Sequence, residues 1–80
     1  RSDLIMRDPT GTLVFVEVRQ RSRNDHGGAA ASIGFVKRRR IVWAARHYLS
    51  RLDAEPPCRF DVIVVEPDGL AWIQAAFDAM

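Results

Sequence analysis

Two carboxylates and one guanidinium near the start of the chain have the types and spacing that suit metal-assisted phosphodiester chemistry. Asp3 precedes a turn, and Glu17 and Arg19 follow it in the segment LVFVEVR, residues 13–19. Because alternate residues of a β-strand share a face, Glu17 and Arg19 are expected on the same side. Two carboxylates can hold Mg²⁺, which polarises a phosphate and activates water. The nearby cation would offset charge on the phosphate.

The turn before this strand determines which residues face each other. The segment DPTG, residues 8–11, has strong turn chemistry, since Pro presets one backbone angle and Gly permits a positive φ. A three-residue loop pairs Asp8 with Thr12. Counting back along both strands then sets Asp3 opposite Glu17, where the carboxylates repel unless a cation or shared proton lies between them. A loop one residue different in length would turn Asp3 to the other face.

The elements that position these residues are predicted from hydrophobic patterning. It indicates an α/β domain with strands at 2–6, 12–20 and 59–66, a basic loop at 21–34, and a helix from 35 to about 53. The crossover from strand to helix to strand is right-handed, so the strand at 59–66 should lie parallel to that at 12–20. An edge strand at 70–73 and a short helix at 74–80, with Phe77 packed inward, complete the prediction.

Several side chains have predicted structural roles. The valine face of the 12–20 strand, Val14, Val16 and Val18, is expected to form the core, and Ser32 or Gly34 is expected to cap the helix. Trp43 and Trp72 are expected to pack in the core or at the sheet edge, with a role as base-stacking platforms as the alternative. An ion pair between Arg59 and Asp61 is the simplest interpretation of that carboxylate, with a site role as the alternative. His47 is expected at the surface or boundary.

The composition describes one small domain spanning residues 1–80. Hydrophobic residues make up 48% and charged residues 28%, which is ordinary for a soluble protein, and no apolar run approaches the roughly 20 residues of a membrane span. Cys58, the single cysteine, is expected to be a small buried hydrophobe and fits a reducing cytoplasm. The chain starts without Met and almost at once with strand-like sequence, which predicts an N-terminally truncated domain.

The net charge of +2 conceals a strong asymmetry along the chain. Residues 17–51 hold nine Lys or Arg and two acids, whereas residues 52–80 hold one Arg and six acids. A basic side on a small domain favours a polyanion such as nucleic acid, with Arg21, Lys37 and Arg40 as phosphate contacts. Solvated surface charge remains the alternative for each of them. The cluster KRRR at the start of the helix opposes the helix dipole, which a bound phosphate would relieve.

A longer set of segments resembles the YraN family of restriction-endonuclease-like, or PD-(D/E)XK, proteins. The segments are SDLIMRD, TLVFVEVRQRS, KRRRIVWAARHYL and CRFDVIVVE, which extend from Asp3 to about Glu66. The resemblance implies a restriction-endonuclease-like mixed sheet, built from an antiparallel hairpin, a crossover helix and a parallel strand. It also implies an N-terminal helix that is missing here. By position, Asp3 and Glu17 match the metal-binding carboxylates, and Arg19 stands where the family commonly has Lys.

The resulting hypothesis is a Mg²⁺-dependent nuclease, with Mn²⁺ as a substitute ion, that acts on nucleic acid and on DNA foremost in the bacterial cytoplasm. The alternative is a non-catalytic nucleic-acid-binding or partner-binding module on the same fold. Arg19 keeps a positive charge and can clamp phosphate, but it is never deprotonated, so binding survives this replacement better than catalysis. Exposed edge strands also make a homodimer an expected partner state.

Overall fold

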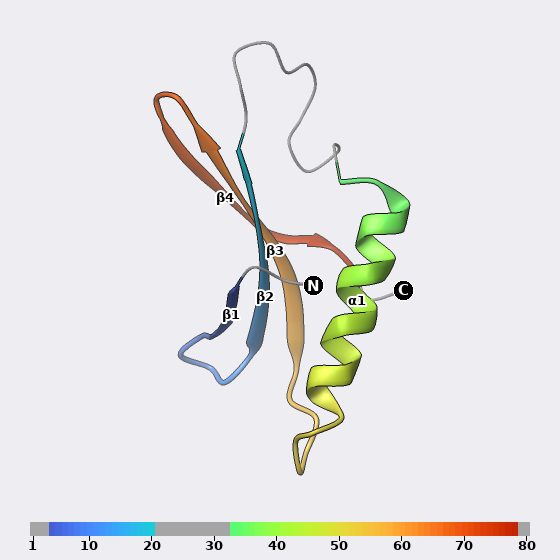
Figure 1. Cartoon of the computed structure of the whole chain (residues 1–80). Helices are drawn as coiled ribbons and strands as arrows, with labels where there is room; N and C mark the ends of the chain where they lie inside the picture. The colour runs from blue at the N-terminus through green and yellow to red at the C-terminus, as the bar shows by residue number, and fades with distance from the viewer. Residues whose placement is uncertain (1–3, 21–32, 79–80) are drawn as a thin grey trace.

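The computed structural model describes residues 4–20 and 33–78 as one mixed β-sheet with one helix (Figure 1). The sheet order is β1-β2-β3-β4, with the outer pairs antiparallel and the central pair β2 and β3 parallel. The elements are β1 Leu4–Arg7, β2 Leu13–Gln20, α1 Phe35–Leu49, β3 Cys58–Glu66 and β4 Gly69–Phe77. The predicted α/β fold class is confirmed, and the arrangement is compatible with a restriction-endonuclease-like fold.

The β1–β2 hairpin has the predicted loop and register. The backbone N–H of Asp8 donates to the carbonyl of Thr12 at 3.0 Å, and Gly11 adopts a φ of 91° that only glycine takes up readily. Along the strands, Leu4 faces Val16, which is the predicted pairing. Asp3 lies outside the described residues, so its expected position opposite Glu17 stays a prediction.

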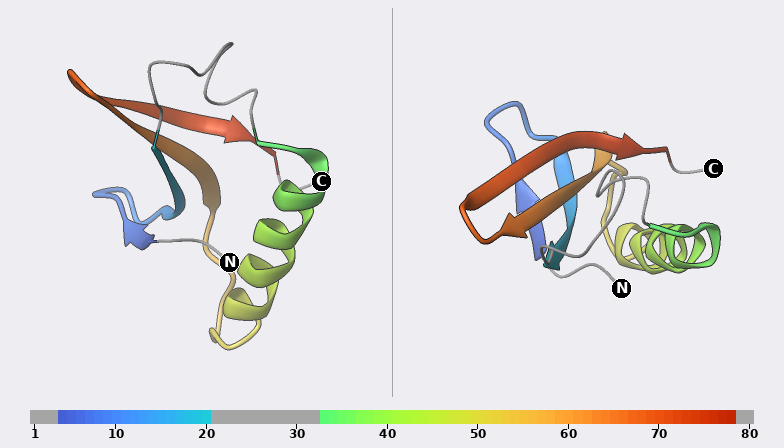
Figure 2. Two further views of the ribbon diagram at one scale, coloured as in Figure 1. Left: turned by 45° about the horizontal axis from the view of Figure 1, so that its top comes forward. Right: turned by 90° about the horizontal axis from the view of Figure 1, so that it is seen from above.

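Helix α1 packs on one face of the sheet, as both views in Figure 2 show. Its inward residues Ile41, Ala45 and Leu49 join a buried cluster with Phe15 of β2 and Phe60 of β3. The rings of Phe15 and Phe60 stack with centroids 5.5 Å apart, because the parallel register sets these two residues side by side. Helix α1 is therefore held against the central strands by this buried cluster.

The helix is shorter at its C-terminal end than predicted. Gly34 is the N-cap, as expected, but the helix ends at Leu49 and does not reach residue 53. Ser50 is the C-cap: its hydroxyl donates to the carbonyl of His47 at 2.7 Å, and the next backbone N–H, that of Arg51, donates to the carbonyl of Tyr48 at 3.2 Å instead of continuing the α-helical pattern. Serine favours such local bonds over continued helix, so the stop precedes the two prolines.

The expectation that the valine face forms the core is wrong in one respect. Helix α1 covers the opposite face, that of Phe15, although Val14 and Val16 are buried as well and Val18 is exposed. In the parallel register Val16 faces Asp61, so the valine face carries a buried carboxylate. Both faces of the central strands therefore hold buried side chains: helix α1 packs on the Phe15 face, and the other face combines valines with the Asp61 carboxylate.

The predicted helix at residues 74–80 is wrong for the part that the structure describes. Strand β4 continues through Phe77, with an irregular register between Phe60 and Val62 on its partner strand. At this irregularity Ala75 has a φ of 51°, and its backbone N–H donates to a carboxylate oxygen of Asp61 at 2.9 Å. Phe77 does pack inward, stacked on Phe60 with centroids 5.1 Å apart.

Candidate metal and nucleic-acid site

Glu17 is a buried carboxylate on the helix-covered face of β2. Only 4% of the residue is exposed, because the start of α1 and the neighbouring Val62 of β3 cover it. Its Oε2 atom lies 2.6 Å from the Nζ atom of Lys37. Its Oε1 atom is also buried, and it accepts no hydrogen bond from any other described residue. Within residues 4–20 and 33–78 the carboxylate is therefore only half satisfied, a state that folded proteins rarely tolerate.

Lys37 extends from the first turns of α1 to this carboxylate. Its side chain is 49% exposed, so the ammonium lies between the buried carboxylate and solvent. An ammonium has three donors, and the Glu17 contact accounts for one of them. The sequence predicted Lys37 as a phosphate contact and did not indicate its pairing with Glu17. That pairing depends on where the helix begins above the sheet.

The remaining predicted site residues are distributed as follows. Arg19 is half-buried and lies two positions beyond Glu17 on the same face of β2, as predicted. Arg40 is exposed on α1. Asp3 and Arg21 lie outside the described residues. Within residues 4–20 and 33–78, no three His, Cys, Asp or Glu side chains come together to hold a metal.

The basic cluster at the start of α1 has protein partners for most of its charges. No acidic residue lies in the first turn, and no side chain caps it. Arg38 donates from Nε to the carbonyl of Ile33 at 3.0 Å, and its guanidinium lies 5.8 Å from the ring centre of Phe77. The guanidinium of Arg39 lies 5.6 Å from the ring centre of Phe35. These contacts offset the unfavourable helix dipole without requiring a ligand.

Asp61 is the second buried carboxylate, and it belongs to a different cluster. It is fully buried on β3, on the face away from Glu17. It accepts hydrogen bonds from Arg59 Nε at 3.1 Å, from Trp72 Nε1 at 2.9 Å and from the backbone of Ala75 at 2.9 Å. The predicted ion pair with Arg59 is confirmed. Because both oxygens have donors, this carboxylate has a structural role.

The predicted packing of Trp43 in the core or at the sheet edge is wrong. The structure leaves it 65% exposed on the outer side of α1, so it packs neither in the core nor at a sheet edge. Trp72, in contrast, lies on β4 with its indole N–H bound to Asp61, in agreement with the prediction. The signal that could have found Trp43 is its spacing: Arg39 and Arg40 precede it by four and three residues, so all three share one side of the helix.

The mixed sheet and its crossover helix are compatible with the restriction-endonuclease-like class of α/β protein. The sequence profile described as uncharacterised protein family UPF0102 matches residues 2–65. The chain therefore belongs to UPF0102, the YraN family. A UPF0102 protein of Cupriavidus taiwanensis is 68% identical over 77 residues, which are 96% of this chain and 59% of that protein. A UPF0102 protein of Paracidovorax citrulli is 65% identical over 77 residues, 96% of this chain and 57% of that protein.

The chain thus spans about three-fifths of the length of the curated bacterial relatives that it matches. Across residues 4–20 and 33–78, no helix combines the length and the apolar character that crossing a membrane requires.

Proposed function

We propose that this chain holds the central part of a metal-dependent nuclease-like site that binds nucleic acid, DNA foremost, in the bacterial cytoplasm. The observation that carries the proposal is the Oε1 atom of Glu17, which is buried without a partner among the described residues. Leaving a buried acceptor unsatisfied costs about 1–3 kcal/mol, more for a charged group. Such a cost is expected at a site that gains a ligand during function.

The donor chemistry at this position fits Mg²⁺, with Mn²⁺ as a substitute. Both ions prefer oxygen ligands, and Glu17 offers one carboxylate oxygen that no described residue binds, beside a half-exposed lysine. Asp3 is the second carboxylate that we expect. Its predicted position opposite Glu17 uses the same register that pairs Leu4 with Val16 in the described part of the hairpin. When bound, the divalent ion would supply Lewis-acid polarisation of a phosphodiester and an activated water.

The cations around Glu17 supply phosphate binding in this proposal. Lys37 keeps donors beyond its contact with Glu17, so its ammonium can hold a phosphate oxygen next to the carboxylate. Arg19 lies on the same face of β2 and adds a positive charge that attracts the phosphate. Arg40 of α1 is a further phosphate contact in this proposal, and Arg21, outside the described residues, is the other that we expect. In this role Lys37 provides the compact ammonium that the family commonly has at the position of Arg19.

A second candidate function is a nucleic-acid-binding module without catalysis. The observation that favours it is the charge of α1, which has five Lys or Arg residues and no acid. Such a surface binds the phosphate backbone whether or not a metal is present. In this alternative the Glu17–Lys37 pair only orders the start of α1.

Calorimetric titration with Mn²⁺ tests the metal part of the proposal. We expect the chain to bind Mn²⁺ and Glu17→Gln to bind it about tenfold more weakly or worse, because the variant loses the anionic ligand. Glu66→Gln, which alters an exposed carboxylate at the end of β3, is the matched control and should bind as the unaltered chain does. Equal binding by all three proteins, or binding by none, would refute the metal site.

Cleavage and affinity measurements then separate the two functions. Metal-dependent cleavage of DNA that is lost in Glu17→Gln supports the nuclease. A salt-dependent affinity for DNA, without cleavage and unchanged by Glu17→Gln, supports the binding module. If the chain shows no cleavage and no salt-dependent affinity for DNA, both functions are refuted and the charges are ordinary surface charge.

A further inference from the structure

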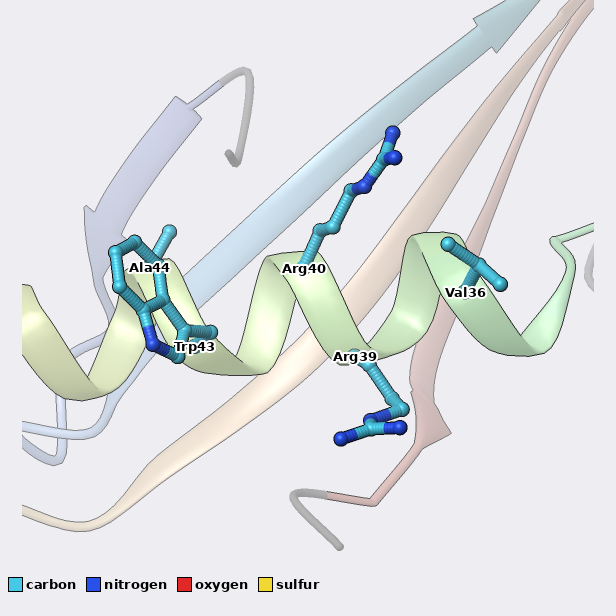
Figure 3. A pocket seen from close by; sticks show the side chains of 5 residues that line it. All are labelled: Val36, Arg39, Arg40, Trp43 and Ala44. Atoms are coloured by element: carbon cyan, nitrogen blue, oxygen red, sulfur yellow. The ribbon is translucent and has the colours of Figure 1, made fainter.

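The outer side of α1 carries an open hollow of about 500 Å³ next to the exposed tryptophan. It is lined by Val36, Arg39, Arg40, Trp43 and Ala44. Figure 3 shows Trp43 at one end and Val36 at the other, with the two arginines extending to opposite sides. Apolar surfaces therefore lie along the helix, and guanidinium groups flank them.

Trp43 is held in place although most of its surface faces solvent. The ring of His47, one turn further along α1, lies 4.0 Å from the indole between centroids, at an interplanar angle of 56°. The indole is 65% exposed, which leaves a large flat apolar surface free. Trp43 shares this exposed apolar surface with Val36, which lines the same hollow, and contiguous exposed apolar patches mark interaction sites.

The charge around the hollow indicates what kind of ligand it takes. Among the described residues its lining has two guanidinium groups and no acid, and α1 as a whole has no acid either. The ligand must therefore combine a flat apolar ring with negative charge. A nucleotide has both features, because its base can stack on an aromatic side chain while its phosphates meet arginine.

We propose that this hollow binds an unpaired nucleotide, with its base stacked on Trp43 and its flanking phosphates held by Arg39 and Arg40. In a duplex the base faces are covered by their neighbours, so the ligand is a single-stranded or splayed segment. The inference rests on the proposed function for the nature of its partner, and it adds the form of nucleic acid that is bound.

The hollow is connected to the proposed metal site through α1. Arg40 lies three residues after Lys37, so the two side chains are neighbours on the helix surface. Lys37 in turn contacts Glu17. A strand whose base occupies the hollow can therefore continue past Arg40 toward the half-satisfied carboxylate.

The test measures the affinity of the chain for a labelled single-stranded oligo-dT of about 15 nucleotides, the upper range of one small binding module. Trp43→Ala should weaken binding by about 5- to 100-fold, the usual effect of losing one base–aromatic stack. Trp43→Tyr should restore most of the affinity, because it keeps a stacking ring. Leu70→Ala removes an equally exposed apolar side chain from β4 and should have no effect. Equal affinity of Trp43→Ala and the unaltered chain would refute the hollow as a nucleotide site.

Two further measurements separate this inference from its alternatives. Sedimentation velocity compares the unaltered chain with Trp43→Ala: a dimer lost in the variant, with unchanged oligo-dT affinity, would assign the hollow to contact between copies and overturn the proposal. Mn²⁺ titration of Trp43→Ala should match the unaltered chain. Retained metal binding without a Trp43 effect refutes the hollow alone, whereas a Trp43 effect without any metal binding refutes the metal site alone.

Discussion

Glu17 on β2 and Asp61 on β3 are both buried carboxylates on neighbouring strands, but their surroundings differ. Asp61 is fully buried and receives hydrogen bonds from a guanidinium, an indole and a backbone amide. Glu17 is 4% exposed, has one lysine on one oxygen and leaves the other oxygen without a partner among the described residues. The two residues also occupy opposite faces of the sheet.

This difference separates a structural carboxylate from a candidate functional one. A fully satisfied buried charge holds its neighbours rigidly, because removing any partner exposes the whole desolvation cost. A half-satisfied one weakens the fold and gains only when a ligand completes it. The sheet thus has a rigid anchor on one face, at the β3–β4 irregularity, and an incomplete site on the other.

The largest expected effect is that of Asp61→Asn on stability. The amide group would direct an N–H toward donors and would leave Asp8 as the remaining acidic partner of the Arg59 guanidinium. We expect the free energy of unfolding to fall by about 3–5 kcal/mol, measured by urea denaturation. A loss below about 1 kcal/mol would contradict the role of Asp61 as the anchor.

Trp72→Phe tests one donor of that anchor and should have a smaller effect. The substitution keeps an aromatic ring but removes the Nε1–H that lies 2.9 Å from Asp61. We expect a loss of about 1–2 kcal/mol in unfolding free energy, since the bond goes to a charged group but the indole is partly exposed. Trp43→Phe changes the other tryptophan at an exposed site and should be nearly neutral by the same denaturation measurement. Equal losses for the two variants would show that ring size, not the hydrogen bond, determines the effect.

Glu17→Gln should change stability less than Asp61→Asn and Trp72→Phe do, by less than about 1 kcal/mol and in the stabilising direction. The variant removes a buried charge that lacks one partner, while the half-exposed Lys37 can turn its ammonium to water. The measurement is again urea denaturation, with Asp61→Asn as the matched comparison. A destabilisation by Glu17→Gln as large as that of Asp61→Asn would make both carboxylates structural.

The sequence predicted those parts of this comparison that depend on local patterns. The turn DPTG predicted the β1–β2 register, and the spacing of Arg59 and Asp61 on one strand predicted their ion pair. Hydrophobic patterning predicted the crossover helix, whose buried side includes Ile41 and Ala45. In each case the partners are neighbours in sequence or follow one period.

The contacts that the sequence did not predict depend on tertiary placement. Lys37 meets Glu17 only because α1 begins above the end of β2, which no local pattern determines. Trp43 lies beside the apolar stripe of its helix, and periodicity alone does not tell which marginal residue stays exposed. Strand β4 continues past residue 73 because the buried Asp61 binds the backbone of Ala75, a contact formed only once the sheet exists.

The smallest expected effect concerns Asp8, which is linked to the Asp61 anchor through Arg59 at 3.2 Å. The hydroxyl of Thr10 donates to Asp8 and, with the backbone N–H groups of Thr12 and Thr10, lowers the pKa of this carboxyl below its ordinary value. Because the folded-state pKa is the lower one, the folded protein binds fewer protons than the unfolded chain. The stabilisation is therefore fully present above the unfolded pKa of about 3.9 and is lost as the pH falls through the folded pKa.

We expect Asp8→Asn to melt at a lower temperature than the unaltered chain at about pH 6, and this difference to shrink steadily on acidification to about pH 3. Thermal unfolding followed by circular dichroism measures it, and Asp53→Asn, an exposed carboxylate after α1, controls for the change in net charge. A difference that is constant with pH would show that Asp8 acts through turn geometry and not through its charge.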